Sequence, residues 1–294
     1  MQKQDELSFK KCFKSNNINT TKKQIYNLIK NLTDYVEGEE RFLICKTLNI
    51  KTQDLLLLKQ FENAQLKKLK KVTKKRIMGI PLNKILKKED FYLDGFVINK
   101  HVLAPRKETE ILVEQSLKQI ENSQKDIVRV LDLCCGSGVI GLSVAKHSKK
   151  KVFVVLTDKS KKALRIAQKN LKDLQIKNAK IVCSDMFSRL KNEDKFDIII
   201  SNPPYIQTSQ IKLLHQGVVK YDPKMALDGG EDGLKFYKII AQNLQDHLVK
   251  NGTVLLEIGF DQADQVSKLF KDQKFCTKVL KDYSKNDRIV IAKQ

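Results

Sequence analysis

The sequence predicts an α/β protein in which a sheet covered by helices follows a small helical part. Three observations lead to this prediction. From residue 127 onward, short apolar runs alternate with segments of helix length, which is typical of parallel strands joined by helices. Residues 1–75 carry apolar side chains at helical spacing instead. Between the two parts, the alternating stretch 90–100 around Asp94-Gly95 predicts a β-hairpin.

The first part is expected to form a helical bundle that includes one strongly basic helix. Its apolar residues recur every three or four positions, as Ile25 and Leu28 do, so one face of each helix can be buried. Gly79 and Pro81 interrupt this pattern and mark the boundary of the part. The predicted helices are 22–32, 39–48, 52–59 and 63–75.

The second part is expected to alternate strands and helices and to end in a strand pair. The predicted strands are 127–133, 151–157, 180–184, 196–201, 253–258, 275–280 and 288–292. The predicted helices are 108–121, 139–147, 160–174, 234–248 and 262–270. This order favours a mostly parallel sheet with both faces covered.

The composition excludes several classes of protein. At about 150 residues per domain, the 294 residues are enough for two domains. No apolar run approaches the roughly 18 residues of a membrane helix, and the N-terminus shows no secretory signal, so no membrane partner is expected. The six cysteines are scattered and form no CxxC pair, which favours a reducing, cytoplasmic location and no metal site.

The net charge of +22 raises the question of an acidic or RNA-bound partner. Lys and Arg total 56, but only seven of them are Arg, the residue that nucleic-acid sites favour for bidentate contacts. The lysine excess therefore favours a general compositional bias. We expect a monomer with no stable nucleic-acid partner, and a contact with RNA through the basic surface stays open.

A glycine-rich turn follows the first predicted strand of the sheet. The segment Asp132-Leu133-Cys134-Cys135-Gly136-Ser137-Gly138 ends that strand, and a helix follows. Glycines at such a turn let the backbone approach a ligand without an intervening Cβ. Asp158 ends the next strand, where a carboxylate can accept hydrogen bonds from both ribose hydroxyls of an adenosine. The pattern indicates an adenosine-containing cofactor and leaves NAD, FAD and S-adenosylmethionine open.

Three further residues bear on the choice of cofactor. S-adenosylmethionine has no phosphate but carries an ammonium and a sulfonium group, so the acidic Asp132 suits it better than it suits a dinucleotide. The structural alternative is that Asp132 only caps the loop. Asp185 and Met186 end the third strand. There a carboxylate can accept the adenine amino group and a methionine can lie against the ring, while a helix N-cap is the structural alternative.

The segment Asn202-Pro203-Pro204-Tyr205 directly follows the buried strand 196–201. Each proline fixes φ and removes an N–H donor, so the loop is stiff and the Pro203 carbonyl is available as an acceptor. The Asn202 side chain offers a second acceptor, and Tyr205 an aromatic wall. Two acceptors can hold both hydrogens of a planar NH2 group, whose nitrogen then faces a methyl donor through positioning and electrostatics. We expect Asn202, Pro203 and Tyr205 to be catalytic.

With these motifs, the sequence resembles the release factor glutamine methyltransferases of the HemK type, which methylate the Gln of the Gly-Gly-Gln motif in peptide chain release factors. The matching segments run from Arg76 to Arg288. They are 79–82, 91–96, 104–110, the glycine turn, 201–205, 231–234, 256–259 and 287–288. This chain departs from the family at Cys134 and Cys135, where Gly and Thr are usual, and at Lys107, where Pro is usual.

The resemblance implies a Rossmann-like, seven-stranded class I methyltransferase domain over 109–294. It implies a helical domain over 1–80 that docks the release factor, and a connecting hairpin over 81–108. From the resemblance and the residue chemistry together, we expect S-adenosylmethionine to bind Asp132, Cys134, Cys135, Gly136, Ser137, Gly138, Asp158, Asp185, Met186 and Asn202. The glutamine substrate would bind Asn202, Pro203, Pro204, Tyr205 and Arg106.

Four alternatives differ in how much of the sequence they explain. Adenine-N6 methyltransferases of DNA or RNA use a similar loop on a similar NH2 group, but no additional base-recognition domain is visible. A ribosomal-protein glutamine methyltransferase is hardly separable by sequence. An NAD-dependent oxidoreductase leaves Asn202–Tyr205 without a role. A non-catalytic basic binding module leaves both the glycine turn and Asn202–Tyr205 without a role.

Overall fold

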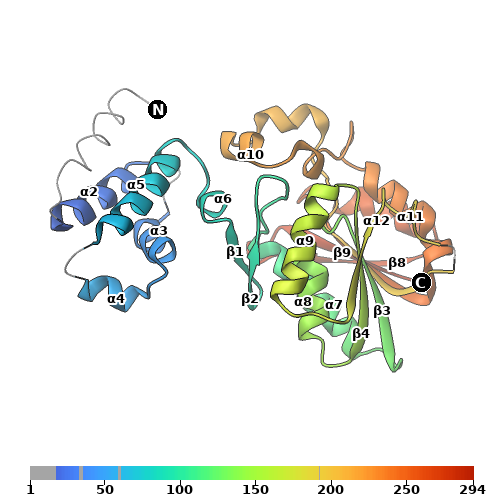
Figure 1. Cartoon of the computed structure of the whole chain (residues 1–294). Helices are drawn as coiled ribbons and strands as arrows, with labels where there is room; N and C mark the ends of the chain where they lie inside the picture. The colour runs from blue at the N-terminus through green and yellow to red at the C-terminus, as the bar shows by residue number, and fades with distance from the viewer. Residues whose placement is uncertain (1–17, 33–35, 59–60, 192) are drawn as a thin grey trace. The chain divides into compact units, whose positions relative to one another are not determined.

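The computed structural model describes residues 18–32, 36–58, 61–191 and 193–294. The chain divides into two compact units, with the boundary between Lys87 and Lys88. The predicted domain limits at residues 80 and 108 bracket this boundary. The short helix α6 (Leu82–Leu86) belongs to the first unit and the hairpin to the second (Figure 1).

The first unit is helical, as the apolar spacing predicts. Besides α6 it contains α2 (Ile18–Lys30), α3 (Glu39–Leu48), α4 (Thr52–Leu57) and α5 (Asn63–Ile77). Its core gathers fully buried aliphatic side chains from three of these helices, among them Ile25, Ile29, Leu43, Ile44 and Leu69. A buried ion pair between Arg76 of α5 and Glu39 of α3 joins two helices within this unit. The predicted helix end at Lys59 lies outside the described residues.

The hairpin consists of β1 (Lys88–Phe91) and β2 (Asp94–Val97), but its turn is not at the predicted Asp94-Gly95. Tyr92 and Leu93 form the turn, and Asp94 pairs with Phe91 at the start of β2. Tertiary contacts explain the shift. The Asp94 carboxylate binds Lys146 and His147, and the backbone N–H of Tyr92 donates to Glu110 at 2.8 Å.

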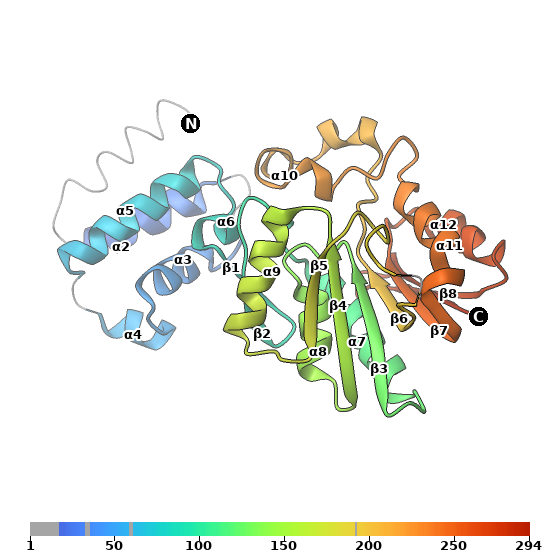
Figure 2. The same cartoon turned by 45° about the vertical axis from the view of Figure 1, so that its right-hand side comes forward.

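Among the described residues of the second unit, seven strands form one sheet in the order β5-β4-β3-β6-β7-β9-β8 (Figure 2). The sheet is parallel except that β9 is antiparallel to both of its neighbours. The strands are β3 (Ile127–Leu133), β4 (Lys151–Asp158), β5 (Ala179–Cys183), β6 (Phe196–Ser201), β7 (Leu248–Glu257), β8 (Cys276–Lys281) and β9 (Asp287–Lys293).

Helices cover both faces of this sheet. Successive strand residues face opposite sides, so Val130 packs in one core with α7 (Glu110–Glu121), α8 (Val139–His147) and α9 (Lys161–Asp173). Leu131 packs in the other core with α11 (Lys235–His247) and α12 (Ala263–Lys271). These two helices lie on the opposite side of the sheet from α7 and α8 (Figure 1). No helix within the described ranges is both long and apolar enough to cross a bilayer.

Three short helices between β6 and α11 were not predicted. They are η2 (Thr208–Leu213), α10 (Gln216–Tyr221) and η3 (Lys224–Ala226). The turn η1 (Lys107–Thr109) precedes α7. The segment 206–230 returns to the end of β6, where the N–H of Ile206 donates to the Leu227 carbonyl and the N–H of Gly229 donates to the Ile206 carbonyl.

Candidate active site

A cavity of about 840 Å³ lies at the carboxyl ends of β3, β4, β6 and β7. The strand order reverses here, because β4 lies on one side of β3 and β6 on the other, and open α/β sheets bind ligands at such a point. The structure brings most of the predicted site residues together in its wall. They are Arg106, Cys134, Cys135, Gly136, Ser137, Asp158, Asp185, Met186, Asn202, Pro203, Pro204 and Tyr205.

The glycine turn between β3 and α8 needs the backbone freedom of its residues. Gly136 and Gly138 have φ values of 56° and 81°, in the region that favours glycine. Cys134 shares this region with φ 58°, which gives a physical reason for glycine at this position in the resembling family. A Cβ on Gly138 would lie 3.0 Å from Leu142 Cδ1, so close packing behind the turn also favours glycine.

The carboxylate of Asp158 holds the turn from β4. One oxygen accepts a hydrogen bond from the N–H of Gly136 at 2.9 Å, and the other accepts from the N–H of Ser160 at 2.7 Å. Burial raises the pKa of Asp158, and the two N–H donors oppose that shift. Since a carboxylate has about four lone-pair sites, these two bonds leave acceptor capacity at the cavity wall.

Two predicted residues, Asp132 and Gly138, are not in the wall of the cavity. Asp132 is fully buried, and its Oδ2 atom accepts a hydrogen bond from the N–H of Gly141 at 2.8 Å. Its Oδ1 atom has no hydrogen-bond partner in the part of the chain that is described. Burial raises its pKa to about 8. Asp132 thus connects the strand end to the first turn of α8 from behind the loop.

Sulfur atoms and an ion pair form another side of the cavity. Cys134 Sγ lies 3.6 Å from Met186 Sδ, so the glycine turn and the end of β5 are in contact there. Burial raises the pKa of the Cys134 and Cys135 thiols, so neither is an activated nucleophile. Asp185 is exposed at the rim, and its carboxylate accepts from Lys159 Nζ at 2.5 Å.

The segment Asn202–Tyr205 leaves β6 and is held in place mainly through its neighbours. Ser201 Oγ donates to the Leu133 carbonyl at 2.7 Å, which ties the end of β6 to β3. The Tyr205 carbonyl accepts from Gln262 Nε2 at 3.1 Å. A Cβ on Gly233 would lie 2.5 Å from that carbonyl oxygen, so the backbone packs closely there.

Asn202 itself makes a long hydrogen bond. Its Nδ2 atom donates to Thr109 Oγ1 at 3.4 Å. Pro203 and Pro204 are buried, whereas Asn202 and Tyr205 are partly exposed. The side chains of Asn202 and Tyr205 therefore face the cavity from a loop whose prolines are packed.

Glu257 ends β7 and reaches the same cavity, although it is almost fully buried. Burial raises its pKa to about 7, while the nearby Thr109 hydroxyl and the charges of Arg288 and Arg106 oppose that shift. Glu108 also faces this carboxyl and raises its pKa further. Burial and the Glu257 charge raise the pKa of Tyr205 as well.

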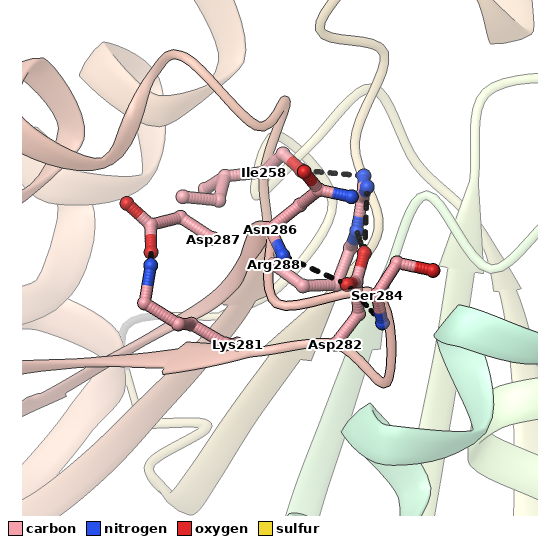
Figure 3. A network of polar contacts seen from close by, with 7 residues as sticks. All are labelled: Ile258, Lys281, Asp282, Ser284, Asn286, Asp287 and Arg288. Atoms are coloured by element: carbon pink, nitrogen blue, oxygen red, sulfur yellow. Dashed lines mark hydrogen bonds and ion pairs between the residues drawn. The ribbon is translucent and has the colours of Figure 1, made fainter.

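Arg288 is held beside Glu257 by the network in Figure 3. It donates to the Ile258 carbonyl at 3.1 Å and to Asp282 Oδ2 at 3.1 Å. Asp282 in turn accepts from the backbone N–H groups of Ser284 and Asn286, each at 2.9 Å. The turn between β8 and β9 thus fixes a cation next to the end of β7.

No sequence motif indicated a role for Thr109 or Glu257, although both lie in the segments on which the resemblance rests. One signal was available for Glu257. It lies at the end of the predicted strand 253–258, as Asn202 follows the predicted strand 196–201, and the carboxyl ends of parallel strands meet at one sheet edge. The structure confirms this neighbourhood, because Ser201 of β6 pairs with Leu256 of β7. For Thr109, the start of a helix gave no indication of its neighbours.

Comparison with known proteins identifies the family. Residues 107–234 match the family model of the methyltransferase small domain. Three curated relatives carry the name release factor glutamine methyltransferase. The protein from Clostridium acetobutylicum is 36% identical over 265 residues, covering 89% of this chain and 88% of the relative. The one from Thermodesulfovibrio yellowstonii is 37% identical over 256 residues, covering 86% and 91%. The one from Fusobacterium nucleatum is 34% identical over 298 residues, covering 99% and 82%.

These matches extend over both units, and they agree with the seven-stranded methyltransferase sheet and its helical covering. The resemblance and the fold class predicted from the sequence are confirmed. The chain belongs to the release factor glutamine methyltransferase family.

Proposed function

We propose that this protein transfers a methyl group from S-adenosylmethionine to the side-chain amide nitrogen, N5, of the glutamine in the Gly-Gly-Gln motif of peptide chain release factors. One observation supports this most directly. The glycine turn with Asp158 and the acceptor loop Asn202–Tyr205 line the same cavity. The names of the relatives support the substrate class.

The residues of the cavity fit S-adenosylmethionine. Asp158 keeps acceptor capacity for the ribose hydroxyls, and the turn 134–138 supplies backbone groups for the amino acid end. Met186 offers an apolar surface to the adenine ring, and Asp185 at the rim offers an acceptor for its amino group. Asp132 lies behind the turn, so we assign it to holding the loop and not to direct contact with the cofactor. A volume of about 840 Å³ is in the range of cofactor pockets.

When bound, this cofactor supplies a methyl group on a positively charged sulfur. The chain's own residues position the acceptor nitrogen. Asn202 Oδ1 and the Pro203 carbonyl accept the two hydrogens of the glutamine NH2 group, and Tyr205 stacks against the planar amide. The reaction then depends on alignment and on electrostatic stabilisation, since an amide nitrogen is a weak nucleophile.

A methyl-transfer assay with labelled S-adenosylmethionine tests the proposed function. The substrates are an intact release factor, the same factor with its Gly-Gly-Gln glutamine replaced by Glu, a ribosomal-protein preparation and an adenine-containing DNA. Label on the parental factor alone is expected. Label on the DNA alone would establish the adenine-N6 methyltransferase alternative. Label on ribosomal protein alone would establish the ribosomal-protein glutamine methyltransferase alternative.

We propose further that the first unit docks the release factor. Its described residues contain helices with a strongly basic α5 and contribute nothing to the cavity wall. A chain that starts at Lys88 is expected to show a much higher KM for intact release factor but a similar KM for a short Gln peptide. Equal losses on both substrates would contradict docking.

A further inference from the structure

The side-chain amide of Asn202 ends in an oxygen and an NH2 group, and only the oxygen suits the proposed function. The oxygen can accept a substrate hydrogen, whereas the NH2 group cannot. A half-turn about the last side-chain bond exchanges the two. The site therefore needs a group that distinguishes Asn202 Oδ1 from Nδ2.

The side chains of two residues from other elements lie on the same side of the cavity as this amide. Asn202 follows β6, Glu257 ends β7, and Thr109 ends η1 directly before α7. All three line the cavity, but Thr109 and Glu257 are only 2% and 1% exposed. Asn202 Nδ2 donates to Thr109 Oγ1 at 3.4 Å, and the Thr109 hydroxyl lies near enough to the Glu257 carboxyl to lower the pKa of that carboxyl.

We propose that Thr109 and Glu257 are positioning residues that hold the Asn202 amide with its oxygen toward the substrate. A hydroxyl has one hydrogen to donate, and an ionised carboxylate can only accept. Thr109 therefore gives its hydrogen to Glu257 and presents a lone pair to Asn202. Only the NH2 end of the amide can satisfy that lone pair.

The opposite orientation of Asn202 is unfavourable for the same reason. It would place the amide oxygen against a hydroxyl oxygen whose hydrogen is already used, so two acceptors would face each other. The Glu257 carboxyl has acceptor capacity to spare, because its Oε2 atom has no hydrogen-bond partner among the residues described. Arg106 and Arg288 favour the ionised form that the arrangement uses.

Substitutions at Thr109 test this inference, which rests on the proposed function. Thr109→Val keeps the shape and removes the hydroxyl, Thr109→Ser keeps the hydroxyl, and Thr253→Val makes the same change at a buried threonine of β7 outside the cavity wall. Single-turnover rates are measured at a pH above the pKa of Glu257. Thr109→Val is expected to lower kcat about 10–100-fold, as when a group that orients an active-site ligand is lost.

The KM for S-adenosylmethionine and the melting temperature of Thr109→Val should stay near the parental values. Thr109→Ser and Thr253→Val should turn over near the parental rate. A double variant with Thr109→Val and Glu257→Gln should be no slower than Thr109→Val alone. Both changes interrupt the same chain of contacts from Glu257 through Thr109 to Asn202. This non-additivity separates positioning from a merely structural role.

Several results would overturn the inference. A parental kcat for Thr109→Val would do so, as would equal losses for Val and Ser or fully additive losses in the double variant. A parent that fails to methylate any release factor would instead refute the proposed function, and the inference with it.

Discussion

Replacing Asn202 by Ala separates the chemistry of the site from its fold. The change removes one acceptor for the substrate NH2 group and one hydrogen bond of 3.4 Å to Thr109. The neighbouring support stays in place, because Pro203 and Pro204 are buried and Gln262 holds the Tyr205 carbonyl. We therefore expect little change in the free energy of unfolding, since the lost bond is long and the side chain is partly exposed.

The expected loss in kcat is about 10²–10³-fold, which is typical when one positioned polar group in an active site is lost. The affinity for S-adenosylmethionine should fall much less, because Asp158 and the glycine turn are untouched. The assay is single-turnover methyl transfer to a release factor, with thermal unfolding and calorimetric cofactor binding as controls.

Asn202→Asp refines the test. The carboxylate keeps acceptors but adds a negative charge, and adenine-N6 enzymes often carry Asp at this position. This variant is expected to lose most of its activity on the glutamine amide in the same single-turnover assay. If Asn202→Ala methylated the release factor at the parental rate, the catalytic assignment of the loop would be wrong.

Three further predictions concern binding, packing and pH. Asp158→Ala should weaken S-adenosylmethionine binding by roughly 1–3 kcal/mol in calorimetry, because it removes charge-assisted hydrogen bonds; unchanged affinity would contradict the ribose assignment. Gly233→Ala should lower the free energy of unfolding, measured in urea, by about 1–2 kcal/mol or more, since φ is 72° there and the new Cβ would lie 2.5 Å from the Tyr205 carbonyl oxygen. An unchanged free energy of unfolding would contradict this close packing. Glu257 has its pKa raised from 4.5 to about 7, so the folded chain holds the proton more tightly than the unfolded chain. The stability from this group is complete below about pH 4.5 and is lost as the pH rises through about 7, a fall of about 3 kcal/mol that Glu257→Gln should abolish.

Much of the fold could be predicted because local patterns and tertiary structure agree. The strands 127–133 and 196–201 are apolar runs that become β3 and β6 with the predicted bounds. The hairpin turn shows the opposite case. Asp94-Gly95 has strong turn preference, but the contacts of Asp94 with α8 place it inside β2 instead.

The segment 206–230 could not be predicted, because it has neither helical nor strand periodicity over a useful length. Its path depends on backbone hydrogen bonds to Ile206 and on close packing of Gly229 and Gly233 against Tyr205. Those contacts exist only once β6 and α11 are in place.

The candidate site was predictable where a motif carries the chemistry, as in the glycine turn and Asn202–Tyr205. It was not predictable where long-range packing decides a residue's surroundings. Asp132 looks like a ligand in sequence, yet the fold buries it behind the turn. Thr109 looks like an ordinary helix start, yet the fold places it between Asn202 and Glu257.

The proposed reaction is defined by the atom that receives the methyl group. Fragmentation mass spectrometry of a release factor, after incubation with this protein and S-adenosylmethionine, locates that group directly. We expect one added methyl on the side-chain nitrogen of the Gly-Gly-Gln glutamine and no such product from Asn202→Ala in the same time. A methyl group on any other residue, or an unmodified glutamine with a fully active cofactor, would contradict it.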